Sequence, residues 1–285
     1  MDLIEKYGRW AVVAGASAGL GLAISEAAAR QGFDLVMVAR REDVLTQSAR
    51  NLADRFGVEA RAVVANLASP EIGETMRSAV EDLDVGVFVY NAAAEPIGSF
   101  LDLPVRKQIA AITVNCVTPT LLTHQIGAQM VKRGRGSIAL VTTIGAFFGS
   151  KLVGSYAASK AYELNLAEGL WDEWRDLGVD VLAYVVGSTA TPNYFQLPEA
   201  SRPDEDEAVE VGDALTTLLN RGRHPMLPAD VASRLFDVLG AGPTQFSSPI
   251  DERLVQRLES LPRAAAIRMQ GELIQHMLEL QGARR

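Results

Sequence analysis

A phenol and an ammonium group stand four residues apart at Tyr156 and Lys160, inside a segment whose composition predicts a helix. At that spacing two side chains lie on the same helix face and can interact. A phenol titrates at about 10 in water, and a nearby positive charge stabilises its ionised form. We therefore expect Lys160 to lower the pKa of Tyr156, so that the phenol serves as an acid or base for a carbonyl or alcohol oxygen. The same pair without chemistry also occurs on ordinary helix surfaces, so the surrounding residues decide the interpretation.

Other polar side chains precede this pair in the chain. Asn115 lies in an earlier helical stretch, and Thr142 and Thr143 end a predicted strand, with Thr143 thirteen residues before Tyr156. A threonine hydroxyl both donates and accepts hydrogen bonds, so it can bind a substrate oxygen.

A glycine-rich turn joins the first predicted strand to the first long helix. Residues 14–21 read AGASAGLG, with Gly15, Gly19 and Gly21 in the turn. Glycine permits a tight turn and lets phosphate oxygens approach main-chain N–H groups at a helix N-terminus, where the helix dipole favours an anion. In this strand–turn–helix setting the sequence predicts the pyrophosphate site of a dinucleotide rather than a turn without a ligand.

The end of the second predicted strand indicates which dinucleotide is bound. An acid about 20 residues beyond the glycines would hold a ribose 2′-hydroxyl, but Ala39 stands there and is followed by Arg40 and Arg41. A guanidinium can pair with a 2′-phosphate, and no carboxylate is present to repel it. The sequence therefore favours NADP(H) over NAD(H), the alternative being two solvated arginines at a helix start.

Short apolar segments alternate with longer helical segments along most of the chain. The apolar segments are continuous, which indicates strands buried on both faces of a parallel sheet. The expected strands are 10–15, 34–40, 59–65, 85–91, 136–143 and 179–186. The first expected helix ends near residue 31, and the later ones cover 43–55, 70–81, 105–133, 156–176 and 228–239. This order predicts an α/β, Rossmann-like, doubly wound parallel sheet with helices on both faces and ligands at the carboxyl ends of the strands.

We expect a single domain with a C-terminal helical tail. Residues 1–249 form the predicted dinucleotide-binding catalytic domain, and the polar, acid-rich stretch of about 192–227 is interpreted as a substrate-loop insertion over the strand ends. Within 250–285, apolar side chains recur at helical spacing with arginines between several of them. Packing against the domain or a second subunit is the simplest role for this extension.

The composition is that of a globular chain. Of 285 residues, 48% are hydrophobic and 22% are charged, and the net charge of −8 opposes binding to nucleic acid. The longest apolar run, 138–148, is too short to cross a bilayer, and the first ten residues lack a signal core, so we expect a cytoplasmic protein. The single Cys116 excludes an internal disulfide, and the three histidines lack metal-ligand spacing.

Together these features resemble the short-chain dehydrogenase/reductase family over residues 10–191. The glycine turn resembles the family's TGxxxGxG, residues 91–93 its NAG, and VVGSTAT after the sixth strand its PGxxxT, with Val186 for proline. Thr143, Tyr156, Lys160 and Asn115 match the family's Ser, Tyr, Lys and Asn in order and spacing. The resemblance implies an NADP(H)-dependent oxidoreductase that interconverts a carbonyl and an alcohol.

The resemblance implies a role for each matching residue. Tyr156 would protonate the carbonyl oxygen as hydride arrives, Lys160 would lower the pKa of that tyrosine and hold the nicotinamide ribose, and Asn115 would position a water between Lys160 and solvent. Asn66 stands in place of the usual Asp that meets the adenine. The residues expected at the cofactor are Gly15, Ser17, Ala18, Gly19, Leu20, Gly21, Arg40, Arg41, Asn66, Leu67, Asn91, Ala92, Ala93, Tyr156, Lys160, Gly187, Thr189 and Thr191.

Two residues depart from the family pattern. Ala14 replaces the usual threonine and removes a hydroxyl from the turn, and Thr143 replaces the substrate-orienting serine. The thirteen-residue spacing to Tyr156 favours Thr143 over Thr142 for this role. Its hydroxyl has the hydrogen-bonding capacity of serine, while its methyl group restricts rotation and pocket shape.

A mostly apolar set of side chains follows the matched motifs, and we expect part of it to line the substrate pocket. This set is Ala94, Glu95, Phe147, Phe148, Tyr194 and Phe195, in which Glu95 is the one charge. Such a lining favours a hydrophobic or aromatic ketone or aldehyde over a sugar, the alternative being that the phenylalanines pack in the core.

Two other functions fit the same residues. A protein that binds NADP(H) without turnover is compatible with threonine at position 143 and predicts cofactor affinity without ketone reduction. A reductase of lipid, steroid or acyl substrates, held at a membrane surface by the tail, would lose liposome association when residues 250–285 are removed. The family resemblance also implies a homodimer or homotetramer.

Overall fold

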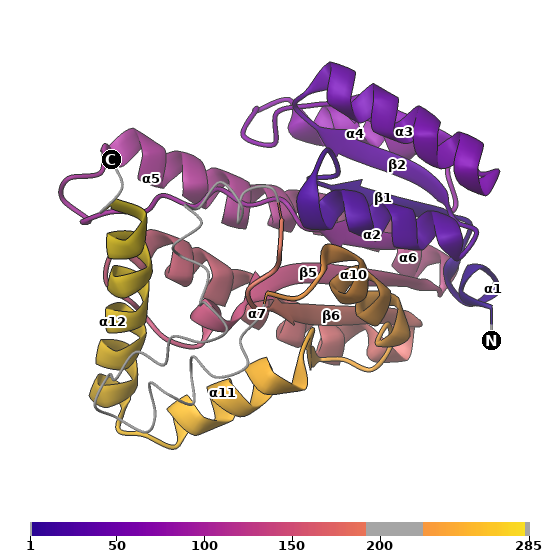
Figure 1. Ribbon diagram of the computed structural model, residues 1–285. Helices are drawn as coiled ribbons and strands as arrows, with labels where there is room; N and C mark the ends of the chain where they lie inside the picture. The colour runs from indigo at the N-terminus through magenta and orange to yellow at the C-terminus, as the bar shows by residue number, and fades with distance from the viewer. Residues whose placement is uncertain (1, 192–224, 283–285) are drawn as a thin grey trace.

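The computed structural model describes residues 2–191 and 225–282, and its centre is one seven-stranded sheet (Figure 1). The strand order is β3-β2-β1-β4-β5-β6-β7, and all neighbouring strands are parallel. The strands are β1 (Trp10–Ala14), β2 (Asp34–Ala39), β3 (Ala60–Val64), β4 (Val85–Tyr90), β5 (Gly136–Thr143), β6 (Val179–Val186) and β7 (Thr244–Phe246). The predicted Rossmann-like α/β fold is confirmed.

Helices cover both faces of the sheet, which explains why its central strands are mostly apolar and buried. On one face lie α2 (Gly19–Arg30), α3 (Glu42–Phe56) and α10 (Pro228–Asp237), and on the other lie α4 (Ile72–Val80), α6 (Thr118–Arg133) and α7 (Gly154–Trp174). Successive residues of β1 point to opposite layers, so Val12 packs with the second group and Val13 with the first.

The strand order places the ligand crevice. β1 lies between β2 and β4, so the chain winds outward from the centre of the sheet in two directions. Ligands of such sheets bind at the carboxyl ends of the strands where the winding reverses. Here the glycine turn follows β1 and the loop from Asn91 follows β4 at this point.

Several short elements were not predicted from the sequence. They are α1 (Leu3–Tyr7), the π-helical turn η1 (Thr113–Val117) between α5 (Val105–Ile112) and α6, the 3₁₀ turns η2 (Ile144–Ala146) and η3 (Arg175–Leu177), and β7, which pairs with β6. Most of the expected insertion at 192–227 lies outside the described residues.

The tail forms two helices, α11 (Pro249–Glu259) and α12 (Arg263–Gly282), drawn in orange to yellow in Figure 1, and apolar side chains of both pack against the segment after β5. Leu258 and Ala266 are buried against Phe148. The described part of the tail is thus packed on the domain. None of the described helices is long and apolar enough to cross a lipid bilayer.

Candidate active site

The glycine turn brings the end of β1 and the start of α2 into contacts that larger residues would prevent. Gly15 has a φ of +87°, and a Cβ atom there would lie 2.9 Å from the backbone of Ala92. A Cβ atom on Gly21 would lie 2.0 Å from the carbonyl oxygen of Gly15. α2 begins at Gly19, and its N-cap Ala18 makes no side-chain cap, so the N–H groups of the first turn can meet an anion. Ser17 and Leu20 complete this turn.

Both arginines that the sequence associates with a 2′-phosphate lie just after β2. Arg40 and Arg41 are exposed, and Arg41 donates a hydrogen bond to the Ser17 hydroxyl at 3.2 Å. Within 2–191 and 225–282, neither guanidinium forms an ion pair with a carboxylate. The Arg41 charge therefore reaches back to the glycine turn, where it can meet a phosphate.

The loops after β3 and β4 lie at the same edge of the parallel sheet as the glycine turn. The side-chain oxygen of Asn66 accepts a hydrogen bond from the Ala68 N–H at 3.1 Å, and Leu67 is buried. The side-chain amide of Asn91 donates to the carbonyl oxygen of Gly15 at 3.4 Å. This bond ties the segment 91–93 to the glycine turn.

The two threonines at the end of β5 have different surroundings. Thr142 is buried, and its hydroxyl donates to the carbonyl oxygen of Lys160 at 2.8 Å, so it fastens β5 to α7. Thr143 is half-buried, ends the strand, and points to the opposite face. The expectation that Thr143 rather than Thr142 offers its hydroxyl to the site is therefore consistent with the packing.

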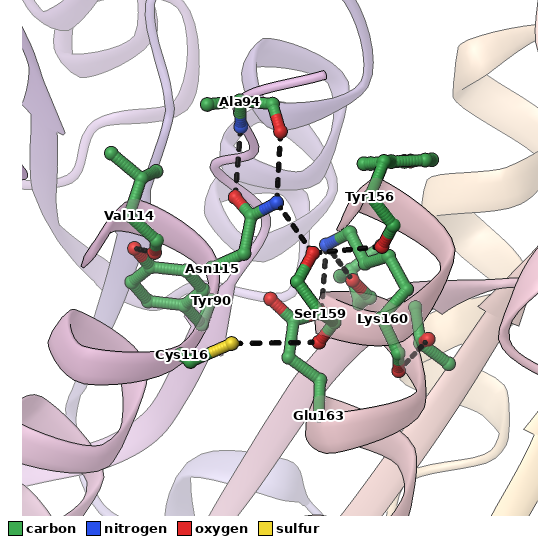
Figure 2. Close-up of polar contacts among 11 residues, drawn as sticks. Tyr90, Ala94, Val114, Asn115, Cys116, Tyr156, Ser159, Lys160 and Glu163 are labelled. Atoms are coloured by element: carbon green, nitrogen blue, oxygen red, sulfur yellow. Dashed lines mark hydrogen bonds and ion pairs between the residues drawn. The ribbon is translucent and has the colours of Figure 1, made fainter. Parts of the chain in front are cut away.

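Tyr156 and Lys160 lie one turn apart near the start of α7 (Figure 2). Lys160 is 3% exposed, and its Nζ donates to the Val141 carbonyl oxygen at 2.9 Å and to Glu163 Oε2 at 2.7 Å. The lysine charge is thus engaged by a carboxylate on the far side of the lysine from Tyr156 along the helix.

The pKa of Tyr156 differs from the sequence-based expectation. Burial raises the pKa of this phenol, and the negative charges of Glu95 and Glu163 raise it further. The expected lowering of this pKa is therefore wrong for this structure, because the phenol is desolvated and the carboxylates of Glu95 and Glu163 oppose its ionisation.

Asn115 lies in the π-helical turn η1, within the stretch that the sequence predicts as one continuous helix. Its Oδ1 accepts from the Ala94 N–H and its Nδ2 donates to the Ala94 carbonyl oxygen, both at 2.8 Å. Nδ2 also donates to the Ser159 hydroxyl at 2.9 Å, so Figure 2 shows Asn115 bridging the loop after β4 and helix α7. The water-positioning role implied by the resemblance stays a prediction.

Two buried polar residues of α7 were missed in the sequence. The Ser159 hydroxyl donates to the carbonyl oxygen of Tyr156 at 2.7 Å. Glu163 is 0% exposed, and burial raises its pKa to about 7 against the opposing charge of Lys160. Its position three residues after Lys160, on the same helix face, is the signal that could have identified it.

Glu95 lies on the loop after β4, and its side chain is accessible to solvent. Neighbouring atoms nevertheless desolvate the carboxylate enough to raise its pKa, while the charge of Lys160 opposes this shift. Since its charge also acts on the phenol of Tyr156, Glu95 lies beside the Tyr156–Lys160 pair.

The carboxyl end of β6 forms a compact turn. The Thr189 hydroxyl donates to the carbonyl oxygen of Gly187 at 3.3 Å, and the Thr191 N–H donates to the Thr189 carbonyl oxygen at 2.7 Å. A Cβ atom on Gly187 would lie 2.0 Å from a carboxylate oxygen of Asp251. The turn expected at the nicotinamide is therefore packed directly against α11.

Phe147 and Phe148 take part in internal packing. The Phe147 ring stacks on Phe246 with a centroid distance of 5.8 Å, and Phe148 is 3% exposed beneath the tail. Packing was the alternative to pocket lining for both residues. Tyr194 and Phe195 lie outside the described residues.

A cavity of about 110 Å³ lies beside the first turn of α7. Its volume is below that of typical small-molecule pockets. The lining residues are Pro96, Gly98, Phe100, Leu103, Gln108, Ser150, Lys151, Leu152, Gly154 and Ser155, none of which the sequence singled out.

These features fit a nicotinamide dinucleotide. The glycine turn offers helix N–H groups without a side-chain cap and a close backbone approach, and the guanidinium of Arg41 contacts Ser17 in this turn. The part of the chain that the structure describes holds no group of three or more His, Cys, Asp or Glu side chains that could bind a metal ion.

The known proteins similar to this chain include proteins named as hydroxysteroid dehydrogenases. A 7beta-hydroxysteroid dehydrogenase of Clostridium sardiniense is 27% identical over 277 residues, which cover 97% of this chain and 100% of that protein. The human inactive hydroxysteroid dehydrogenase-like protein 1 is 33% identical over 201 residues, which cover 68% of this chain and 61% of that protein.

The fold and a family model agree with these similarities. A solved structure from a study of 7beta-hydroxysteroid dehydrogenase stereoselectivity has a TM-score of 0.83 at 30% identity, covering 95% of this chain and 100% of that chain. The family model described as short chain dehydrogenase matches residues 9–201. The chain therefore belongs to the short chain dehydrogenase family of oxidoreductases.

Proposed function

We propose that this oxidoreductase uses NADP(H) to interconvert a ketone or aldehyde and an alcohol, on a hydrophobic substrate of the hydroxysteroid class. The observation that supports the proposal is the joining of α7 to the end of β5 through Thr142 and Lys160, since it holds the helix that carries Tyr156 against the strand that ends in Thr143. The steroid class is supported by the similarity to 7beta-hydroxysteroid dehydrogenases over almost the whole chain.

In this proposal Tyr156 is the acid/base group. The phenol is protonated at neutral pH, since burial only raises its pKa, so it has a proton to donate as negative charge develops on a carbonyl oxygen. The Thr143 hydroxyl would donate a second hydrogen bond to the same oxygen and orient the carbonyl. In the oxidative direction the phenolate would take the alcohol proton back.

The cofactor would be held by the glycine turn, by Arg40 and Arg41 at the 2′-phosphate, and by Lys160 at the nicotinamide ribose. Bound nicotinamide supplies or accepts the hydride. Family membership supports a nicotinamide dinucleotide in general, and the arginines support the phosphorylated form. The turn from Gly187 to Thr191 would close the crevice at the other end.

The experiment is a turnover assay with NADPH and NADH against aliphatic, aromatic, acyl and steroid ketones, including a 7-oxosteroid. We expect NADPH oxidation with the largest kcat/KM for steroid ketones. Preference for a sugar, or for NADH, would contradict the substrate class or the cofactor assignment respectively. No oxidation of either nucleotide with any carbonyl, despite binding, would contradict the enzymatic proposal.

A non-catalytic NADP(H)-binding protein is the second candidate. The pairing of Lys160 with Glu163 and the similarity to a protein named as inactive favour it. It predicts NADPH binding without turnover in the same panel, and a Tyr156→Phe variant that binds NADPH as the wild type does.

Homo-oligomerisation belongs to the proposal as well. Apolar side chains are exposed along α5 and η1, with Val105 72%, Ile109 56% and Val117 56% exposed. Light scattering coupled to size-exclusion chromatography should give the mass of a dimer or tetramer, and a monomer at assay concentrations would contradict this part.

A further inference from the structure

Glu163 and Lys160 form an ion pair inside the domain. Oε2 of Glu163 lies 2.7 Å from Nζ of Lys160, and the two side chains are 0% and 3% exposed. Removing two charges from water is costly, and the mutual attraction of a buried pair often does no more than offset that cost. The pair therefore contributes little net stability, and its proximity to Tyr156 suggests a role in the site.

The surroundings of Glu163 leave its carboxylate under-satisfied. Among the described residues, its second oxygen, Oε1, is buried without a hydrogen-bond partner. The titratable groups whose charges act with it are Lys160 and Tyr156 on α7, Tyr90 on β4 and Cys116 on η1, and β5 has no titratable side chain. Lys160 is thus the one cation among these groups.

Lys160 has a second anchor that does not depend on Glu163. Its Nζ also donates to the Val141 carbonyl oxygen at 2.9 Å, at the strand that ends in Thr143. An ammonium carries three donors, so loss of the carboxylate contact frees a donor without detaching the side chain from β5.

We propose that Glu163 is a positioning residue that retains the Lys160 ammonium at the base of the site and, when a proton neutralises its carboxylate, releases it toward the nicotinamide ribose. This inference rests on the proposed function, in which Lys160 contacts that ribose. The proton comes from solvent and stays on Glu163.

The direction of the pH dependence follows from burial. Burial raises the pKa of Glu163 to about 7, so the ionised form that retains Lys160 prevails above this pH and the neutral acid below it. In this proposal the protein with neutral Glu163 is the state that binds the cofactor, and its fraction decreases as the pH rises. The apparent Kd is the intrinsic Kd divided by this fraction. Cofactor binding by the wild type should therefore weaken as the pH rises.

The test measures the Kd of NADPH, by the change in nicotinamide fluorescence, for the wild type and for Glu163→Gln from about pH 6 to about pH 8. One unit above its pKa only about a tenth of Glu163 is protonated, so near pH 8 the wild type should bind up to about tenfold more weakly than the variant. Near pH 6 the two Kd values should agree within about twofold. The 2′-phosphate titrates equally in both proteins, so the ratio of Kd values isolates Glu163.

The matched control is Glu168→Gln, on the same helix, where Glu168 accepts a hydrogen bond from Thr244 at 2.6 Å outside the site. It should reproduce the wild-type Kd at every pH. If Glu163→Gln does not fold, the double variant Lys160→Met/Glu163→Val replaces the pair by apolar side chains and supplies the reference pH trend. Wild-type affinity should then fall with pH relative to that reference.

A ratio of wild-type to Glu163→Gln Kd values that stays constant across the pH range would overturn the inference. A purely structural role of Glu163 would change the Kd by the same factor at low and at high pH. If that happened while ketones were still reduced, the proposed function would stand alone. A pH-dependent ratio without any turnover of ketones would support the role of Glu163 and contradict the proposed enzymatic function. A wild type that binds no NADPH at any pH would overturn both.

Discussion

The hydroxyl of Thr142 donates to the carbonyl oxygen of Lys160 at 2.8 Å and so fixes helix α7 against the C-terminal end of strand β5. Because successive strand residues point to opposite faces, the same contact turns Thr143 away from this packing. Neighbouring threonines with the same hydroxyl therefore have different roles, which substitution can separate.

Thr143→Val should lower kcat/KM for a ketone substrate at least about tenfold, because it removes one hydrogen bond to the carbonyl oxygen in the transition state. Thr142→Val should instead lower the free energy of unfolding by about 0.5–1.5 kcal/mol, since it removes a buried hydrogen bond that joins β5 to α7. Steady-state kinetics and urea denaturation of both variants check this. A larger kinetic effect at Thr142 than at Thr143 would reverse the assignment.

Tyr156→Phe should lower kcat by about 10²–10⁴-fold, the range for loss of a general acid, while the Kd of NADPH changes little. Tyr162→Phe is the matched control on the same helix, where the hydroxyl shares a hydrogen bond with Thr120 at 2.5 Å. Full turnover by the Tyr156 variant would remove the phenol from the mechanism.

Arg41→Ala should raise the Kd of NADPH about tenfold or more and leave the Kd of NADH nearly unchanged, because a charge-assisted hydrogen bond contributes about 1.5–3 kcal/mol. Arg50→Ala, an exposed arginine on α3, serves as the control. Equal effects on both nucleotides would show that Arg41 does not read the 2′-phosphate.

Gly21→Ala should abolish measurable NADPH binding and lower the melting temperature, since its Cβ atom would lie 2.0 Å from the carbonyl oxygen of Gly15. Gly169→Ala is the contrasting variant, because a Cβ atom on this α7 glycine meets nothing within 4 Å. Alanine in an open helix position should raise stability by about 0.5–1 kcal/mol. Calorimetry and fluorescence titration of both proteins make the comparison.

Glu163 should also leave a mark on stability as a function of pH. Its pKa rises from 4.5 to about 7 on folding, so between these values the folded chain binds more protons than the unfolded chain. The free energy of unfolding of the wild type relative to Glu163→Gln should therefore fall as the pH rises through this window. Denaturant titrations at several pH values measure it, and a flat difference would mean that the carboxyl titrates normally.

The α/β architecture follows from patterns that are local in the chain. β1, β2 and β4 are buried at every position and are apolar apart from Asp34, because helices cover both sheet faces, and this apolar pattern is visible without coordinates. The glycine turn is equally readable, since the φ of Gly15 and the close approach of Gly21 restrict those positions to glycine.

Short elements and an irregular turn were not readable in this way. β7 has three residues, too few to show a period, and its pairing with β6 is a contact across many residues of sequence. The π-helical turn at Asn115 has the composition of an ordinary helix. In this turn Asn115 forms hydrogen bonds with Ala94 and Ser159, which lie in other parts of the chain and are not visible in the local sequence.

The ion-pair partner of Lys160 shows most clearly the difference between what the sequence predicts and what the tertiary structure decides. Helical spacing alone places both Tyr156 and Glu163 within reach of the ammonium, one turn before it and one turn after it. The tertiary structure decides that Lys160 pairs with Glu163. Burial strengthens the attraction between these opposite charges and desolvates the phenol of Tyr156. The hydrogen bond from Lys160 Nζ to the Val141 carbonyl oxygen also holds the ammonium at strand β5. Spacing is a property of neighbouring residues, whereas desolvation depends on every segment that closes around the site.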